Sequence, residues 1–287
     1  MLLHAALTEA SAHISRRDAE TLLAHLLHRD RAWLFAHPEA ELTPTDLDHL
    51  RSFTARRAAA EPLQYLTGQQ EFYGLTLRVT PDTLIPRPET ELLVEAVLHH
   101  VAQRTPTSPL RIPDLRILDV GTGTGAIALA LATHLPNAII TACDISASAL
   151  TVARDNALRL NLTHRIQFVL SDLLAAPELH THPFDILVSN PPYVSTADAP
   201  TLQPEVLHHE PHTALFAGAD GLSVYRRLIP QAHAALSPNG LLALEFGFGQ
   251  RNALQTLLES TPPGGWHSIR FLDDYASIPR VALAIRA

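Results

Sequence analysis

The sequence predicts an α/β fold: a seven-stranded, mostly parallel sheet with an antiparallel last strand, preceded by a small helical bundle and a β-hairpin. After about residue 115, short apolar segments of β type alternate with segments of helical periodicity, which is typical of a parallel sheet covered on both faces. The first 60 residues instead repeat apolar side chains at three- and four-residue spacing. We therefore expect a helical domain at 1–62, a hairpin linker at 63–83 and the sheet domain at 84–287.

Composition excludes several classes of function. All 21 basic residues among the 287 are arginine, so a Walker-type phosphate loop and lysine Schiff-base chemistry are excluded. The net charge of -8, with arginines scattered along the chain, argues against direct DNA binding. The single cysteine, Cys143, fits a reducing compartment, and no apolar run reaches membrane-spanning length. We expect a cytoplasmic monomer that does not enter a membrane.

The N-terminal segment has the capping signals of short helices. Ser15 or Asp18 can cap one helix, and Thr43 followed by Pro44 can open another. Residues 63–79 then alternate around Gly74, which predicts the hairpin. The apolar positions of the bundle are Leu22, Leu23, Leu26, Leu27, Leu47, Leu50 and Phe53.

The segment PDTLIPRPETELL follows at 81–93. Its three prolines favour an extended approach to a helix that opens at Pro88. Glu89 and Glu91 would lie in the first turn of that helix, where the helix dipole favours acids. Capping is therefore one account of both glutamates, and a site role is the other.

After a proline-rich loop at 106–113, strands and helices alternate to the end of the chain. The last two strands have too little chain between them for a parallel crossover, so we expect an antiparallel pair. Strands are expected at 116–120, 139–144, 166–170, 184–189, 241–246, 268–272 and 281–285, with helices at 126–134, 147–161 and 225–236.

A glycine-rich loop joins the first of these strands to its helix. Glycines let the backbone turn tightly and point its amides at an electronegative group. Dinucleotides and S-adenosylmethionine both bind such loops, but Asp119 favours the second cofactor, because an acid repels a pyrophosphate and can hold an ammonium group. The predicted cofactor-binding residues of the loop are Gly121, Thr122, Gly123, Thr124 and Gly125.

Acidic residues follow the next two strands. Asp144 can bind ribose hydroxyls, Asp172 can accept from an adenine amino group, and Leu173 can pack on the ring. Helix capping or turn formation is the alternative account of Asp144 and Asp172. Ligands of doubly wound sheets lie beyond the carboxyl ends of the strands, where all these residues are expected.

The strand at 184–189 must stop at Asn190, because Pro191 and Pro192 have no N–H for a sheet ladder. A plain turn is one interpretation. In the other, the Asn190 side-chain oxygen and the Pro191 carbonyl each accept one N–H of a planar amide or exocyclic amine. Tyr193 then packs against the flat group, and a cofactor methyl lies opposite the nitrogen. Asn190, Pro191 and Tyr193 are thus the candidate catalytic residues of a methyltransferase.

Four segments together resemble the protein-glutamine N5-methyltransferases of translation release factors, the PrmC or HemK family. They are Asn190–Tyr193, the Gly121–Gly125 loop, IPRPETE at 85–91 and HEPHTALFAGADGL at 209–222.

The resemblance implies a Rossmann-like class I S-adenosylmethionine methyltransferase whose substrate is the glutamine of the Gly-Gly-Gln loop of class I release factors. It also implies a helical N-terminal domain that helps to bind the factor. Relatives suggest tryptophan at Leu173 and glycine at Ala219. The residues implied to hold the glutamine are Asn190, Pro191, Pro192, Tyr193, Arg87 and Glu89, and Asn190 also touches the cofactor.

Two other functions stay open at this point. An adenine N6 or guanine N2 methyltransferase acting on DNA or rRNA would carry an arginine-rich face near Tyr193. A non-catalytic cofactor-binding module would only dock a ribosomal partner. Metal is not expected, because adjacent histidines on a helix do not face one another and HExxH and CxxC motifs are lacking. Glu245 is either structural or part of the pocket.

Overall fold

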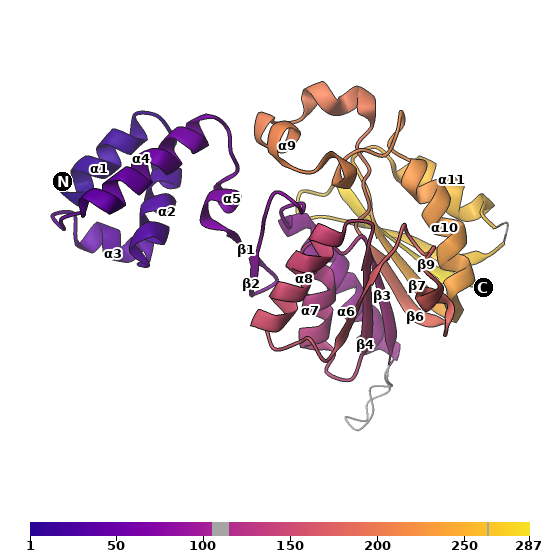
Figure 1. Cartoon of the computed structure of the whole chain (residues 1–287). Coiled ribbons are helices and arrows are strands. Elements are labelled where there is room, and N and C mark those ends of the chain that lie inside the picture. Colours follow the sequence, from indigo (N-terminus) through magenta and orange to yellow (C-terminus); the bar gives the residue numbers. More distant parts are fainter. Residues whose placement is uncertain (105–114, 263) are drawn as a thin grey trace. The chain divides into compact units, whose positions relative to one another are not determined.

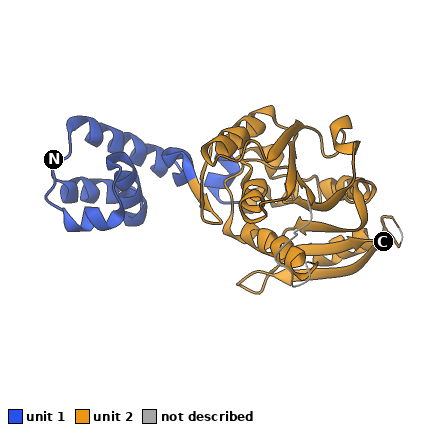
Figure 2. Ribbon diagram, turned by 90° about the horizontal axis from the view of Figure 1, so that it is seen from below, with its two compact units in different colours: residues 1–69, 202–209 blue, residues 70–201, 210–287 orange. Residues whose placement is uncertain are grey.

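Figure 1 shows the computed structural model, which describes residues 1–104, 115–262 and 264–287. The predicted loop at 106–113 lies outside them. The chain divides into two compact units, residues 1–69 with 202–209, and residues 70–201 with 210–287 (Figure 2). The three-part division expected from the sequence stays a prediction, and the structure adds that 202–209 belongs with the N-terminal residues. None of the described helices is both long and apolar enough to cross a bilayer.

The first unit is a helical bundle, as predicted. Ser15 is the cap that the sequence left undecided, because its hydroxyl accepts from the Asp18 amide. Thr43 caps the fourth helix in a reciprocal capping box with Asp46. Leu22 and Leu50 are buried in its core. Its helices are α1 (Leu3–Ser11), α2 (Arg16–Leu27), α3 (Arg31–Ala36), α4 (Pro44–Ala58), α5 (Leu63–Thr67) and α9 (Pro204–His209).

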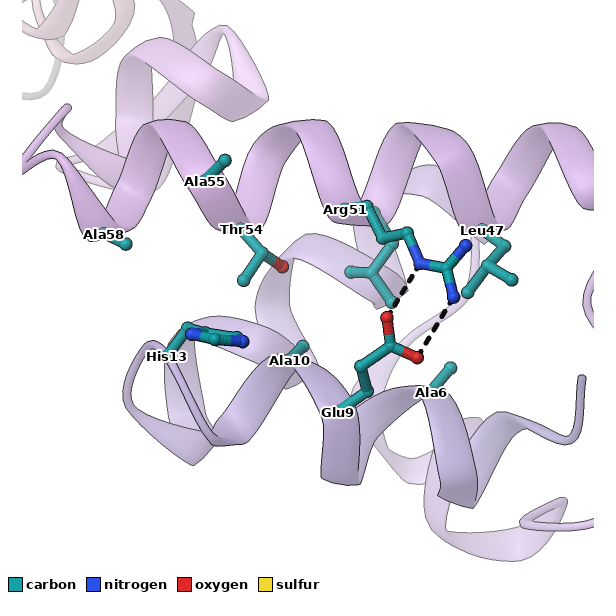
Figure 3. A pocket seen from close by; sticks show the side chains of 10 residues that line it. Ala6, Glu9, Ala10, His13, Leu47, Arg51, Thr54, Ala55 and Ala58 are labelled. Carbon is teal, nitrogen blue, oxygen red and sulfur yellow. Dashed lines mark hydrogen bonds and ion pairs between the residues drawn. The ribbon is translucent and has the colours of Figure 1, made fainter.

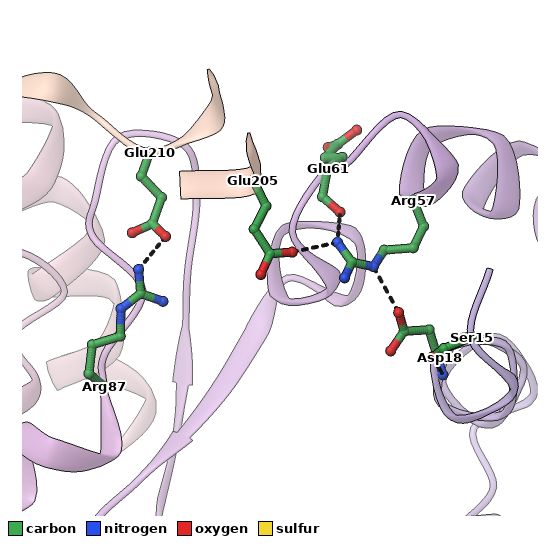
Figure 4. A network of polar contacts seen from close by, with 7 residues as sticks. All are labelled: Ser15, Asp18, Arg57, Glu61, Arg87, Glu205 and Glu210. Carbon is green, nitrogen blue, oxygen red and sulfur yellow. Dashed lines mark hydrogen bonds and ion pairs between the residues drawn. The ribbon is translucent and has the colours of Figure 1, made fainter. Parts of the chain in front are cut away.

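Arg57 holds the sequence-distant parts of this unit together (Figure 4). Its guanidinium donates to Asp18 at 2.9 Å, to the Glu61 carbonyl at 3.0 Å and to Glu205 at 2.6 Å. The partners come from α2, from the residues that follow α4 and from α9, and the Asp18 and Glu205 side chains are only partly exposed. This network is the physical reason why α9 groups with residues so far away in the sequence.

A cavity of about 250 Å³ lies between α1 and α4 of this unit (Figure 3). Alanine and leucine side chains make most of its wall, and the ion pair of Glu9 with Arg51, at 2.7 Å, lies beside it. The Thr54 hydroxyl is buried there, and none of the described residues bonds to it.

The hairpin is present, but it is shorter than expected. β1 (Gln69–Phe72) and β2 (Leu75–Arg78) form a separate two-stranded sheet. Extended structure was predicted from residue 63, and this is wrong for α5, which occupies Leu63–Thr67. Pro62 precedes the helix and Gly68, with φ of 71°, ends it, so a proline and a glycine delimit one short turn of helix.

The second unit contains a seven-stranded sheet in the order β5-β4-β3-β6-β7-β9-β8. All neighbours are parallel except β9, which runs antiparallel to both β7 and β8, as the class predicts. Its strands are β3 (Arg116–Val120), β4 (Ile139–Asp144), β5 (Ile166–Leu170), β6 (Phe184–Ser189), β7 (Leu236–Glu245), β8 (Trp266–Asp273) and β9 (Pro279–Arg286).

The first four strands have the predicted bounds, whereas the prediction for β7 started five residues late. Leu236 already pairs with Phe184, and the register then shifts before Leu241 pairs with Ile186. Asn239, at φ of 62°, lies inside this irregular stretch. A β-bulge that carries Pro, Asn and Gly resembles a loop in the sequence, which explains the error.

Successive side chains of the strands enter different cores. Ile117 and Ile186 pack on one face with α6 (Glu91–Arg104), α7 (Ala126–His134) and α8 (Ala147–Arg159). Leu118 and Leu187 pack on the other face with α10 (Ser223–Ala235) and α11 (Arg251–Ser260). Figure 1 shows these two layers of helices flanking the sheet. The helix α11 was not predicted from the sequence.

Short 3-10 helices connect the larger elements. They are η1 (Pro88–Thr90), η2 (Pro177–His180), η3 (Thr196–Thr201) and η4 (His212–Ala214). The turn η1 opens α6, as the sequence predicted for Pro88.

Asn156 of α8 fastens the hairpin to the sheet unit. Its Oδ1 accepts from the Arg78 amide at 2.7 Å, and its Nδ2 donates to the carbonyls of Arg78 and Thr124, both at 3.0 Å. The side chain is 1% exposed, so water cannot replace these bonds.

We expect Asn156→Ala to lower the free energy of unfolding by about 2–4 kcal/mol, because buried backbone groups lose their partners. Urea unfolding followed by circular dichroism measures the change. Asn252→Ala, at an exposed position of α11, is the matched control and should change stability by less than about 0.5 kcal/mol. Equal stability of the two variants would show that Asn156 does not fasten the hairpin.

Candidate active site

A cavity of about 370 Å³ lies at the carboxyl ends of β3, β4, β5 and β6. The strand order reverses between β3 and β6, so this edge is the topological switch point. Val120 pairs with both Cys143 and Ser189, so the residues after these strands start side by side. Most of the predicted residues line this one cavity. They are Gly121, Thr122, Gly123, Thr124, Asp144, Asp172, Leu173, Asn190, Pro192 and Arg87.

The glycine loop turns through left-handed conformations, with φ of 74° at Gly121 and 54° at Gly123. A Cβ at either residue would meet no atom within 4 Å, so the backbone of both residues has open space beside it. Gly125 differs, because a Cβ there would lie 3.3 Å from that of Ala153 in α8. The first two glycines thus leave room for a ligand, and the third permits close helix packing.

Asp119 has a different role from the one expected. It is fully buried and does not line the cavity. Its Oδ2 accepts from the Thr122 hydroxyl at 2.6 Å and from the Ala128 amide at 3.3 Å, while no described residue bonds to its Oδ1. Burial raises the pKa of Asp119 to about 7, although the Thr122 hydrogen bond opposes the shift. The carboxyl therefore fixes the loop from inside.

Asp144 links the loop to the next strand end. One oxygen accepts from the Gly123 amide at 2.8 Å, and the other accepts from the Ser146 amide at 2.9 Å. Burial raises the pKa of Asp144, and these amides oppose that shift. The turn-forming role that the sequence left open is therefore real, and the carboxylate still borders the cavity.

The third strand end holds Asp172 and Leu173. Asp172 pairs with Arg227 of α10 at 2.6 Å, at an exposed position. Leu173 adopts φ of 51°, a conformation uncommon for leucine, and its side chain borders the cavity. Ile145 lies close by, 62% exposed, and the sequence analysis did not single it out.

Asn190 is held by a residue from the PETE segment. Its Nδ2 donates to the Thr90 hydroxyl at 3.0 Å. Within the described parts of the chain, no donor reaches its Oδ1 and none bonds to the Pro191 carbonyl. Neither acceptor predicted from the sequence thus has a partner among the described residues, and Asn190 lines the cavity, whereas Pro191 is buried and does not.

Tyr193 is partly buried and is not among the residues that line the cavity. Its carbonyl accepts from Gln250 Nε2 at 2.9 Å. A Cβ at Gly221 would collide with that carbonyl, and one at Gly247 would lie 2.9 Å from the Tyr193 ring. Burial raises the pKa of the Tyr193 phenol. Two glycines from distant loops thus make the space that this turn occupies.

Arg87 and Glu89, both predicted to bind substrate, separate in the structure. Arg87 borders the cavity and pairs with Glu210 at 2.5 Å (Figure 4). Glu210 is 4% exposed and also accepts from the Ile85 amide. Glu89 is exposed and is not among the lining residues. The roles of both residues stay predictions.

Thr90 and Phe216 were missed as candidates. Both lie within segments that carried the family resemblance, so their signal was present, but Thr90 was overlooked between two glutamates considered as caps. The described residues contain no group of three potential metal ligands.

Comparison with known proteins agrees with this geometry. The profile described as PrmC N-terminal domain matches residues 3–68, and the one described as methyltransferase small domain matches residues 98–218. A release factor glutamine methyltransferase of Moorella thermoacetica is 43% identical over 100% of this chain and 99% of its own. One of Koribacter versatilis is 40% identical over 99% and 98%. The chain belongs to the release factor glutamine methyltransferase family.

Solved structures show the fold of this family member at lower identity. The Thermus thermophilus 16S rRNA N2 G1207 methyltransferase, in complex with AdoMet and guanosine, is 20% identical and aligns with a TM-score of 0.53 over 76% of this chain and 50% of its own. A methyltransferase from Pyrococcus furiosus is 18% identical, with a TM-score of 0.52 over 82% and 98%. The sheet unit therefore has the class I methyltransferase fold, as predicted.

The buried Asp119 predicts a pH dependence of stability. Its pKa is about 7 in the folded chain against 3.8 as the ordinary value, so folding takes up a proton between these pH values. The contribution of this proton uptake to the free energy of unfolding is complete below about pH 4. It is lost as pH rises towards 7, by no more than about 1.4 kcal/mol per pH unit. Asp119→Asn should therefore gain stability relative to the wild type between pH 5 and 7.

Urea unfolding of both proteins at pH 5, 6, 7 and 8 measures this difference. Asp273→Asn, at an exposed position of β8, controls for the substitution itself. A stability difference between Asp119→Asn and wild type that is constant over this range would contradict the assignment.

Proposed function

We propose that this family member transfers a methyl group from S-adenosylmethionine to the side-chain nitrogen of the glutamine in the Gly-Gly-Gln loop of class I peptide chain release factors. The observation that carries the proposal is Asn190 beside the glycine loop, with its carbonyl oxygen available at the switch point. The substrate named for the relatives of Moorella thermoacetica and Koribacter versatilis supports the choice of release factors.

The residues around the cavity fit the cofactor. The open backbone at Gly121 and Gly123 allows close approach, and Thr122 and Thr124 border the same space. Asp144 and Asp172 can accept hydroxyl and amino protons, and the apolar side chain of Leu173 can cover a ring. Bound there, S-adenosylmethionine supplies an electrophilic methyl group on a positively charged sulfur.

Asn190 and Pro191 prepare the nucleophile. An amide nitrogen is weakly nucleophilic because its lone pair is delocalised into the carbonyl. The Asn190 Oδ1 and the Pro191 carbonyl can accept one N–H each, which orients the NH2 group and favours the positive charge that develops on nitrogen. An asparagine side chain cannot take a proton as a base, so the proton lost after transfer goes to water.

The helical unit and the other predicted site residues also have roles in this reaction. The helical unit, whose residues 3–68 match the PrmC N-terminal domain, would bind the release factor. The protein would act as a cytoplasmic monomer, where release factors work, without binding DNA. Arg87, Pro192 and Tyr193 would shape the glutamine site, and Glu89, from its exposed position, would contact the factor outside the cavity.

Labelled S-adenosylmethionine and a purified release factor test the activity. We expect label on the intact factor and none on a factor whose Gly-Gly-Gln glutamine is replaced by alanine. Label on the glutamine-free factor, or on ribosomal RNA or DNA in its place, would contradict the assignment and favour a nucleic-acid amino methyltransferase.

Asn190→Ala tests the site. It removes one of two acceptors that orient the amide, and we expect kcat to fall by roughly 100-fold or more. Calorimetric titration with S-adenosylmethionine should still show binding, because the loop is unchanged. Asn252→Ala should keep the wild-type rate, and a wild-type rate in Asn190→Ala would show that Asn190 does not orient the amide in the reaction.

A further inference from the structure

Glu245, the last residue of β7, is the buried acid that the reaction as described does not use. It is 1% exposed, and it lies between β6 and β9, where it pairs with Val281. Its Oε2 is buried, and no described residue donates a hydrogen bond to it. An incompletely satisfied buried carboxyl is costly for folding. Because Leu244 pairs with Ser189, Glu245 and Asn190 lie at the ends of neighbouring strands, and this position calls for an explanation.

The groups around Glu245 come from several elements. Burial raises the pKa of Glu245 to about 7, and hydrogen bonding by Thr90, the charge of Arg280 and hydrogen bonding by Tyr193 oppose that shift. Glu89 adds to the rise. Tyr225 of α10 donates to the Glu245 backbone carbonyl at 2.8 Å. Among the described residues, two hydroxyls, one cation and one further acid thus influence the pKa of this carboxyl.

Thr90 connects this carboxyl to the site. Its hydroxyl accepts a hydrogen bond from Asn190 Nδ2 at 3.0 Å, and a hydroxyl can donate only one hydrogen bond of its own. The hydrogen bonding of Thr90 lowers the pKa of Glu245, so the Glu245 carboxyl is the acceptor of that bond. With its proton committed to Glu245, Thr90 presents only a lone pair to Asn190.

We propose that Glu245 is a positioning residue that acts through Thr90 to fix the orientation of the Asn190 amide, so that Oδ1 and not Nδ2 faces the substrate. This inference rests on the proposed glutamine methylation. It explains how the Asn190 Oδ1 is oriented towards the substrate, and it gives Thr90 and Glu245 a role in that reaction.

The direction of the hydrogen bonds decides whether the oxygen or the NH2 group of Asn190 faces the substrate. An ionised Glu245 can only accept, which forces Thr90 to accept from Asn190. A protonated or neutral side chain can donate to Thr90, and Thr90 can then donate to Asn190 and turn its NH2 towards the substrate NH2. Two donors would then face each other, so the ionised form is the productive one.

The test compares Thr90→Val, Thr90→Ser and Glu245→Gln with wild type. We expect Thr90→Val and Glu245→Gln to lower kcat by roughly 10- to 100-fold, as is usual for residues that orient a group in contact with substrate, with KM for S-adenosylmethionine unchanged. Thr90→Ser keeps the hydroxyl and should restore most of the rate. Thr141→Val, a buried threonine of β4 away from the cavity, is the matched control and should keep the wild-type rate.

Two readouts separate positioning from plain structural support. The wild-type kcat should rise with pH through about 7 as Glu245 ionises, and Glu245→Gln should lack this rise. In 15N-labelled protein without cofactor, one Asn190 side-chain amide proton should exchange slowly in wild type and fast in Thr90→Val. Glu245→Gln should melt no lower than wild type at pH 8, because it removes a buried charge.

The outcomes distinguish the two proposals. If wild type does not methylate the release factor, glutamine methylation fails, while the amide-exchange measurement still reports on the Thr90 contact. If wild type methylates the factor but Thr90→Val keeps full kcat and a protected amide proton, the positioning role is overturned alone. A loss of kcat in Glu245→Gln that follows a large drop in melting temperature would also overturn it.

Discussion

Parallel pairing of β3 with β6 places the residues that follow Val120 and Ser189 next to each other, and the rest of the site depends on that neighbourhood. The Ser189 hydroxyl donates to the Val120 carbonyl at 2.6 Å and so fastens the two strand ends together. Glycine then continues one strand and asparagine the other, because a tight turn is needed after the first and two prolines end the second. A shift of one residue in this register would point the strand side chains to the opposite faces and separate the loop from the amide.

The sequence predicted correctly those elements whose bounds depend on residues close to them in the chain. The bounds of β3 to β6 and of α7 follow from apolar runs that glycine, proline or acidic residues end, and these were predicted correctly. The bulged start of β7 could not be predicted, because its first pairing is with Phe184, about fifty residues earlier. Thr90 bonds to a residue one hundred positions away, and Arg57 to one 148 positions away. Such contacts depend on the folded sheet and leave no periodic signal in the sequence.

Two buried carboxyls show that the fold accepts local instability around the site. Asp119 and Glu245 each have a raised pKa, and each has one buried oxygen without a bond from any described residue. Asp119 uses its other oxygen to fix the glycine loop from inside. Glu245 ends β7, the strand next to β6, and so lies beside the start of the Asn-Pro-Pro-Tyr turn. Incomplete satisfaction of buried groups is expected where a structure holds functional geometry at some expense in stability.

The chemistry of the two acceptors also bears on which nitrogen the site can bind. Both Asn190 Oδ1 and the Pro191 carbonyl are neutral oxygens, so they suit the two N–H groups of a neutral planar amide better than a lysine ammonium, which would favour carboxylates. Two carboxylates are bound elsewhere, because Asp119 fixes the loop and Glu210 pairs with Arg87. Asp144 and Asp172 do line the cavity, but they lie at the carboxyl ends of β4 and β5, two and three strands away from β6 and Asn190. Proline on both sides of the Pro191 carbonyl's peptide bond keeps that acceptor rigid. Selection of a neutral amide therefore depends on where the fold places these carboxylates as well as on the asparagine itself.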